Sequence, residues 1–368
     1  MKRELEAVTM KHKSNTYTKA CAVLLILTLV IIPTMLTGCS KKDNDKATTL
    51  PETEPAMMAR EDINPFTGLS GYTPSEVSSR PLIVSINNAP PARPQWGLTS
   101  PDMILEFEAE GGVTRMLWVY AKAENMPEKM GSMRSARHYF VEMVEGFDAI
   151  FLHWGGSTFA YDRMKNLKTD HIDGITYSDK YFARDKSRNV ALEHTGYTTG
   201  ANMIKAIKDL KVRTDIKEDY KYPFTFAPEN APRALSGQDC SSILAVFSSS
   251  YKYTFKYNAE DNKYYSFINN NKTVDDKGEQ VAVENVFVLY ANVESMGTDK
   301  GHVTYDLTKG EGLYVYGGKA EQIKWEKGSD RDMLKLYDLS GKELVINPGK
   351  SWMGFVKSAN AGQTEIQP

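Results

Sequence analysis

Two arginines, Arg134 and Arg137, are the residues whose type and spacing most suggest chemistry. Ser132 is a suitable N-cap for a helix ending near Gly146, which would place the two guanidinium groups one turn apart at the helix start. There they could hold one anion together with the free helix N–H groups. The alternative is a solvated helix face on which both arginines pair with acids such as Glu142.

A second cluster is the acidic run Glu106, Glu108 and Glu110, which is followed by two glycines and Arg115. In a strand these carboxylates would share one face, where they could share a proton, bind a divalent cation or pair with arginines. A solvent-facing strand that ends in a Gly-Gly hairpin is an equally good interpretation.

His153 ends an apolar run and precedes Trp154 and two glycines that open a helical pattern. The carboxyl end of a buried strand is the usual place for a ligand site in an open α/β sheet. If the strands are neighbours, Asp148, Arg115 and Arg134 could converge on His153. In the alternative, His153 only donates a hydrogen bond to a backbone carbonyl.

Further along, the charges of Arg184–Arg188 and Glu193–Thr195 are typical of ion pairs in a surface loop. Catalysis by His194 would need a nucleophile that the sequence does not identify.

The chain shows no zinc-protease, P-loop, nucleophile-elbow or dinucleotide motif, so whether it is an enzyme stays open. No cofactor is indicated, although a divalent cation is possible at the glutamates. With 45 Lys and Arg against 47 Asp and Glu, and no basic tract with interleaved aromatics, a nucleic-acid partner is not expected. If Cys21 is removed with a signal peptide and Cys39 carries a lipid, as argued below, Cys240 has no cysteine with which to form a disulfide.

The elements that would position these residues fall into two parts. Residues 63–230 alternate apolar runs, such as Leu82–Ile86, with helical patterns, which predicts an α/β domain (or α+β). Residues 231–368 contain short runs rich in Tyr, Val and Phe between turn residues, which predicts a mainly β domain.

The N-terminus indicates export. Lysines precede an apolar stretch, Ala20–Ile32, that is too short to span a bilayer comfortably and leads to Leu36-Thr37-Gly38-Cys39. This is a lipobox, so we expect a signal peptide at 1–38, fatty-acyl lipid such as palmitate on Cys39, and a polar tether over 39–62. The protein would then be extracytoplasmic and anchored to the cell membrane, and the lack of disulfides fits a Gram-positive envelope.

The chain also resembles the YerB-like bacterial lipoproteins. The resemblance is carried by the lipobox, the Glu106–Arg115 and Gly131–Phe140 segments, and Asn347–Trp352, and it extends over nearly the whole mature chain. It implies two domains of unknown function in the cell envelope, with the arginine pair, Glu106, Glu110 and Arg115 following the family pattern.

Three hypotheses remain open. In the first, Glu106, Glu110, Arg115, Arg134, Arg137 and His153 form a site for an anionic cell-wall or lipid-linked ligand. In the second, the chain is a metal-assisted phosphotransferase or hydrolase of cell-wall polymer metabolism. In the third, it is a non-catalytic scaffold for a membrane-bound wall synthase or hydrolase and exposes an aromatic patch. The partners are accordingly the membrane and a wall polymer, precursor or synthesis protein.

Overall fold

The computed structural model describes residues 62–368, which form one compact unit. The predicted signal peptide, the Cys39 anchor and nearly all of the predicted tether lie outside the described residues.

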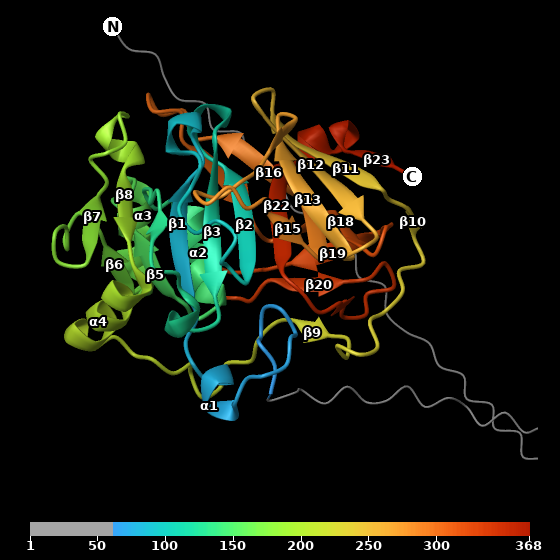
Figure 1. Ribbon diagram of the computed structural model, residues 1–368, viewed down its shortest axis with the longest axis horizontal. Helices are drawn as coiled ribbons and strands as arrows, with labels where there is room; N and C mark the ends of the chain where they lie inside the picture. The colour runs from blue at the N-terminus through green and yellow to red at the C-terminus, as the bar shows by residue number, and fades with distance from the viewer. Residues whose placement is uncertain (1–61) are drawn as a thin grey trace, which may run out of the picture. The chain divides into compact units, whose positions relative to one another are not determined.

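One large sheet of twelve strands connects the two halves of the sequence (Figure 1). In spatial order its path is β10 (Gln238–Asp239), β19 (Lys319–Glu326), β18 (Lys309–Tyr316), β16 (Asn285–Ser295), β22 (Ser351–Lys357), β2 (Met103–Glu108), β3 (Thr114–Tyr120), β1 (Leu82–Asn87), β5 (Ile150–His153) and β6 (His171–Asp173); β17 (Val303–Asp306) pairs with β16, and β20 (Lys335–Tyr337) with β19. Because β2 pairs with β22, main-chain hydrogen bonds join the predicted α/β and β halves.

Smaller sheets and helices cover this large sheet. A second sheet contains β11 (Ser242–Ser248), β12 (Tyr251–Asn258), β13 (Lys263–Ile268), β14 (Asn271–Lys272), β15 (Ala282–Val283) and β23 (Glu365–Gln367); a third contains β4 (Met130–Gly131), β7 (Phe182–Arg184) and β8 (Gly196–Thr198); and β9 (Thr225–Phe226) pairs with β21 (Val345–Ile346). The α-helices are α1 (Pro74–Val77), α2 (His138–Gly146), α3 (Thr158–Leu167) and α4 (Gly200–Leu210), and the 3-10 helices are η1 (Pro90–Ala92), η2 (Glu110–Gly112), η3 (Ala123–Asn125), η4 (Leu192–His194) and η5 (Ser358–Gln363).

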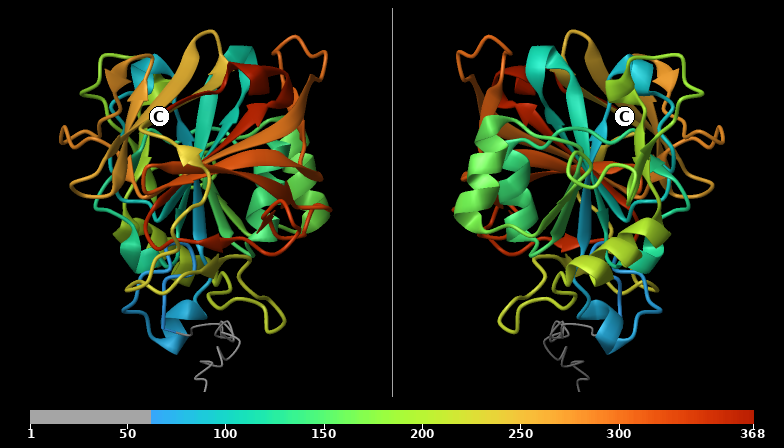
Figure 2. Two further views of the ribbon diagram at one scale, coloured as in Figure 1. Left: turned by 90° about the vertical axis from the view of Figure 1, so that its right-hand side faces the viewer. Right: turned by 90° about the vertical axis from the view of Figure 1, so that its left-hand side faces the viewer.

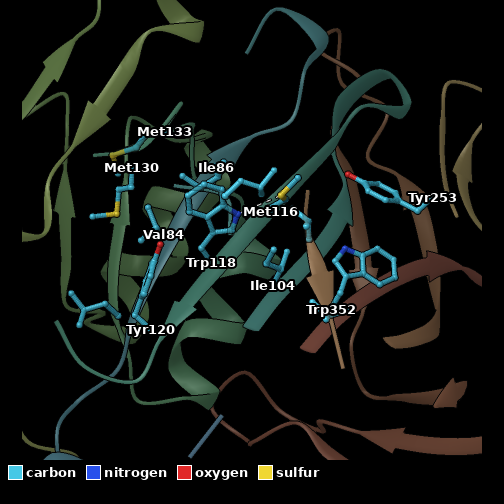
Figure 3. Close-up of a cluster of buried hydrophobic side chains, with 14 of the residues drawn as sticks. Val84, Ile86, Ile104, Met116, Trp118, Tyr120, Met130, Met133, Tyr253 and Trp352 are labelled. Carbon is cyan, nitrogen blue, oxygen red and sulfur yellow. Dashed lines mark hydrogen bonds between the residues drawn. The ribbon is translucent and has the colours of Figure 1, made fainter. Parts of the chain in front are cut away.

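Both faces of the large sheet are buried, which explains why its central strands are continuously apolar. In β1, Leu82, Val84 and Ile86 face one core, while Ile83 faces the other. Helices α2 and α3 cover the Ile83 face, and the second sheet and α4 cover the opposite one (Figure 2). Figure 3 shows this opposite core, where Trp118 and Trp352 pack among methionines and aliphatic side chains. Burying each such large side chain contributes roughly 1.5–3 kcal/mol, so the packing holds the strand ends in fixed positions.

The directions of the strands place several strand ends at one edge of the large sheet. Strands β5 and β22 are parallel to β1 and β2 respectively, β6 is parallel to β5, and β16 is parallel to β22; β3 runs antiparallel to both β1 and β2. All of these strands except β3 therefore end at the same edge, which we call the carboxyl edge. In open α/β sheets, ligands usually bind at this edge.

The predicted fold class is confirmed, with helices concentrated in the first half and strands dominating the second. The predicted helix start at Ser132 is wrong, because α2 begins at His138 with Arg137 as its N-cap. Met133 and Ala136 instead form β-bridges with Ile86 and Gly156. Their backbone partners lie in neighbouring strands and turns, which holds the segment extended.

Candidate functional site

Arg115 and Arg137 meet at one carboxylate on the carboxyl edge. Arg115 Nη2 lies 2.8 Å from Glu110 Oε2, and Arg137 Nε donates a hydrogen bond to Glu110 Oε1. The two arginine side chains are only 7% and 8% exposed, and that of Glu110 is 21% exposed. A short connection makes this possible, since Gly111 and Gly112 take positive φ angles of 64° and 76° between Glu110 and β3.

The charges in this cluster shift the pKa values of its members. Burial raises the pKa of Glu110, but the hydrogen bond from Arg137 and the charges of both arginines outweigh it and hold the pKa at about 2. Burial, followed by the charges of Arg137 and Arg134, lowers the pKa of Arg115 to about 9. The single negative charge of Glu110 therefore does not neutralise the positive charges of Arg115 and Arg137.

Arg134 lies at the open side of the same group. Its Nη2 is 3.0 Å from Glu193 Oε2, and the two side chains are 25% and 51% exposed. Its backbone is fixed, because Arg134 N donates to Ser85 O and Trp154 N donates to Arg134 O. Among the described residues, Glu193 is the only hydrogen-bond partner of the Arg134 guanidinium, so Nε and Nη1 remain available.

We call Arg115, Arg134 and Arg137 the arginine cluster. Arg115 and Arg137 contact Glu110, and the charge of Arg134 acts on Arg115, although Arg134 sits on an extended segment and not on the expected helix. Neither Glu142 nor Glu145 pairs with them, because Glu142 contacts Arg163 and Glu145 contacts Arg331.

Glu106 is separated from this cluster. Its carboxylate accepts hydrogen bonds from Asn88 Nδ2 at 2.9 Å, Trp352 Nε1 at 3.0 Å and the Thr114 hydroxyl. The side chain faces the core that β2 shares with the second sheet, and burial raises its pKa. The expected common face of the three glutamates is wrong, because β2 ends at Glu108 and Glu110 lies in the following turn.

His153 belongs to another group on the same edge. Its Nε2 is 2.9 Å from His171 Nδ1, its Nδ1 is 2.8 Å from Gly155 O, and burial lowers its pKa to about 4. Asp173 Oδ1 lies 3.8 Å from His153 Nδ1 and accepts the backbone N–H of Gly155. His153 therefore supports the Gly155 turn that adjoins the arginine segment, where Ala136 N donates to Gly155 O.

Asp148 does not join this edge, contrary to expectation. It precedes β5, whereas His153 ends it, so the two residues lie at opposite ends of the strand. Asp148 instead pairs with Arg213 at 2.6 Å and with Lys217 at 3.3 Å, and Arg80 Nε lies 3.9 Å from it.

Two neighbours of the arginine cluster were not identified as site residues from the sequence. Glu193, which we assigned to loop ion pairs, contacts Arg134. His302, in the connection between β16 and β17, places Nε2 3.7 Å from Glu110 Oε1. Both approach the arginines from segments distant in sequence, and no local spacing signals that approach.

Within residues 62–368, no group of three or more His, Cys, Asp or Glu side chains is placed to hold a metal ion. In the same part of the chain, no helix is long and apolar enough to cross a bilayer.

Comparisons with known proteins place this chain in a family. The model "Protein of unknown function (DUF3048) N-terminal domain" matches residues 66–213, and the corresponding C-terminal domain matches residues 243–353. YerB of Bacillus subtilis (strain 168), which is named as a lipoprotein, is 29% identical over 342 residues that cover 92% of this chain and 96% of the relative. The crystal structure of the YerB protein from Bacillus subtilis matches with a TM-score of 0.72 and 26% identity, over 83% of this chain and 99% of that one. The chain therefore belongs to the YerB-like lipoprotein family, both of whose domains are described as having unknown function.

Proposed function

We propose that this protein is an envelope lipoprotein, anchored through Cys39 outside the cytoplasmic membrane, whose carboxyl edge binds an anionic cell-wall or lipid-linked ligand. The observation that carries the proposal is that Arg115 and Arg137 share a single carboxylate, with Arg134 open beside them.

The location rests on the sequence and on the relative. The Leu36–Cys39 lipobox follows an apolar stretch of signal-peptide length, and YerB is named as a lipoprotein. The signal peptide, acylation by palmitate or another fatty acid, and the Gram-positive envelope remain parts of the proposal.

The charge balance supports an anion as ligand. Arg184 Nη1 donates to Leu192 O, and the charge of Arg134, after burial, lowers the pKa of Arg184. Arg115, Arg134, Arg137 and Arg184 thus carry four positive charges in this region, whereas Glu110 and Glu193 carry two negative charges. A phosphate or carboxylate at Arg134 would supply the missing negative charge and could be held by two parallel N–H groups.

The ligand would enter from the Arg134 side. The Arg134–Glu193 pair is partly exposed, so its net contribution to folding is about 0–1 kcal/mol, and an anion can replace Glu193 at little cost. Glu110 is held more firmly by two buried arginines and would keep them in position.

The geometry gives less support to the other two hypotheses. A metal-assisted phosphotransferase or hydrolase would need carboxylates beside the arginines that can hold a cation. Glu110 and Glu193 are already paired with arginines, Glu106 faces another core and Asp148 lies at the far end of β5. A scaffold that exposes the tryptophans of the β half is not favoured, because Trp325 and Trp352 are 1% and 2% exposed. A divalent cation remains a prediction to include in the binding test.

The test is a thermal-shift screen of the soluble chain from Ser40 onward, with phosphorylated wall precursors and divalent cations. A ligand at 100 times its dissociation constant should stabilise the native chain by about 2.7 kcal/mol. Arg134→Ala should lose most of this stabilisation and change the stability of the free protein by less than about 1 kcal/mol.

Arg331→Ala is the matched control, because Arg331 is another exposed arginine paired with a glutamate, Glu145, away from the carboxyl edge. It should respond to the ligand like the native chain. If the ligand stabilises Arg134→Ala and Arg331→Ala equally, the arginine cluster does not bind it.

A further inference from the structure

Apolar side chains stand exposed around the arginine cluster. Among residues 62–368, the large apolar side chains classed as exposed are few, and three of them come from segments next to this site: Phe159, Ile175 and Leu192. Ile175 is 64% exposed and Leu192 is 66% exposed, more than any of the others. Single exposed apolar residues are common, but their concentration beside one charged site indicates binding.

Ile175 adjoins the arginine segment through Gly155. A Cβ atom on Gly155 would lie 2.9 Å from Ile175 Cδ1 and 3.6 Å from Ser135 Oγ, so both atoms lie close to the same point beside the glycine. The carbonyl of Ser135 accepts a hydrogen bond from Arg115 Nη1 at 2.9 Å. An aliphatic side chain therefore lies next to the backbone that orients the arginines.

Leu192 borders the open end of the cluster. Its carbonyl accepts a hydrogen bond from Arg184, and the next residue, Glu193, forms the ion pair with Arg134. The anion that replaces Glu193 would thus arrive beside Leu192.

Phe159 borders the other end. It lies in the first turn of α3, and its ring centroid is 5.7 Å from that of His302, whose Nε2 is 3.7 Å from Glu110. Apolar side chains therefore flank the charged group from the Arg134 end to the Glu110 end.

We infer that the ligand of this site is amphiphilic: a phosphate ester of a membrane lipid, with its phosphate at Arg134 and its hydrocarbon chain against Ile175 and Leu192. This inference rests on the proposed function and narrows its ligand class. A purely polar anion would leave the two aliphatic side chains in water, whereas a hydrocarbon chain would remove them from it. Each methylene group that becomes fully buried adds about 0.8 kcal/mol, or roughly fourfold in affinity.

The experiment is isothermal titration calorimetry of the soluble chain from Ser40 onward, which keeps the whole compact unit. The probes are butyl phosphate and decyl phosphate, the latter below its micelle-forming concentration, with decyl glucoside as an uncharged chain of equal length. We expect decyl phosphate to bind at least about tenfold more tightly than butyl phosphate, and decyl glucoside to bind more weakly than either.

The variant Ile175→Ser with Leu192→Ser should remove most of the preference for decyl phosphate and leave the affinity for inorganic phosphate, which has no methylene groups, unchanged. Both side chains are exposed, so folding should be preserved, and circular dichroism checks this. Ile204→Ser, at a 42% exposed position on α4, is the matched control and should keep the preference.

The outcomes separate the two proposals. Equal binding of both phosphates would overturn the amphiphilic ligand and leave the anion site in place. If neither phosphate binds, both proposals fail. Decyl glucoside binding as tightly as decyl phosphate would also overturn this inference, because the arginines would then contribute nothing.

Discussion

Glu106 and Glu110 are four residues apart and have opposite environments. The Glu110 side chain is 21% exposed and contacts two arginines, whereas Glu106 is fully buried among neutral donors. The pKa of Glu110 is held at about 2, while burial raises the pKa of Glu106. The comparison teaches that one acidic run can supply a structural acceptor and a site residue at the same time.

The end of β2 causes this difference. Glu106 is still inside the strand, so it follows the alternation that places Ile104 on the same face. After Glu108 the chain enters η2, and Gly111 and Gly112 turn it so that Glu110 reaches Arg137 at the start of α2.

Replacing Glu106 should have the largest effect on stability. Glu106→Ala removes the acceptor of three buried donors and should lower the free energy of unfolding by about 3 kcal/mol or more. Urea unfolding measures this change. Glu106→Gln, which keeps the shape and one acceptor oxygen, is the control and should lose less. A loss below about 1 kcal/mol for Glu106→Ala would show that the buried carboxylate is not structural.

Replacing Glu110 should cost less and make stability depend on added anion. Glu110→Gln leaves Arg115 and Arg137 without their counter-charge and should lower the free energy of unfolding by about 2 kcal/mol, since the pair is partly exposed. Inorganic phosphate should then stabilise this variant more than the native chain, as measured by thermal unfolding at matched ionic strength. If chloride and phosphate act equally, Glu110 does not occupy an anion position.

The sequence predicted the fold class and the family, and it named Glu110, Arg115, Arg134 and Arg137 as residues of one candidate site. The Gly111-Gly112 turn is a local signal, because a short hairpin must bring Glu110 close to Arg115. The short apolar runs of β1 and β2 are also a local signal and correctly located these central strands.

The rest depended on contacts between distant segments. Ser132 has the side chain of a helix cap, but Met133 and Ala136 take backbone partners from β1 and the β5–α3 turn, so the helix starts later. The approach of Glu193 and His302 to the arginines is set by packing that no local pattern encodes. For the same reason, the strand position of Glu106 could be predicted, but not the donors that surround it.

The pH dependence of unfolding should show the two glutamates with opposite signs, and this is the smallest effect that we predict for these two residues. The folded pKa of Glu110, about 2, is below its ordinary value of 4.5, so its contribution is present above pH 4.5 and is lost as pH falls toward 2. Between pH 4.5 and pH 3 this loss should be about 1–2 kcal/mol, and Glu110→Gln should remove it from the curve.

For Glu106 the folded pKa is raised, so the sign is reversed. The contribution of Glu106 to the free energy of unfolding is present below pH 4.5 and is lost as pH rises through the folded pKa. The stability of Glu106→Gln should therefore increase relative to that of the native chain as pH rises toward neutral. Urea unfolding of the native chain and both variants from pH 3 to pH 8 measures the two difference curves. Curves of the same sign would contradict this comparison, because the arginines oppose protonation of Glu110, whereas burial favours protonation of Glu106 in spite of its hydrogen-bond donors.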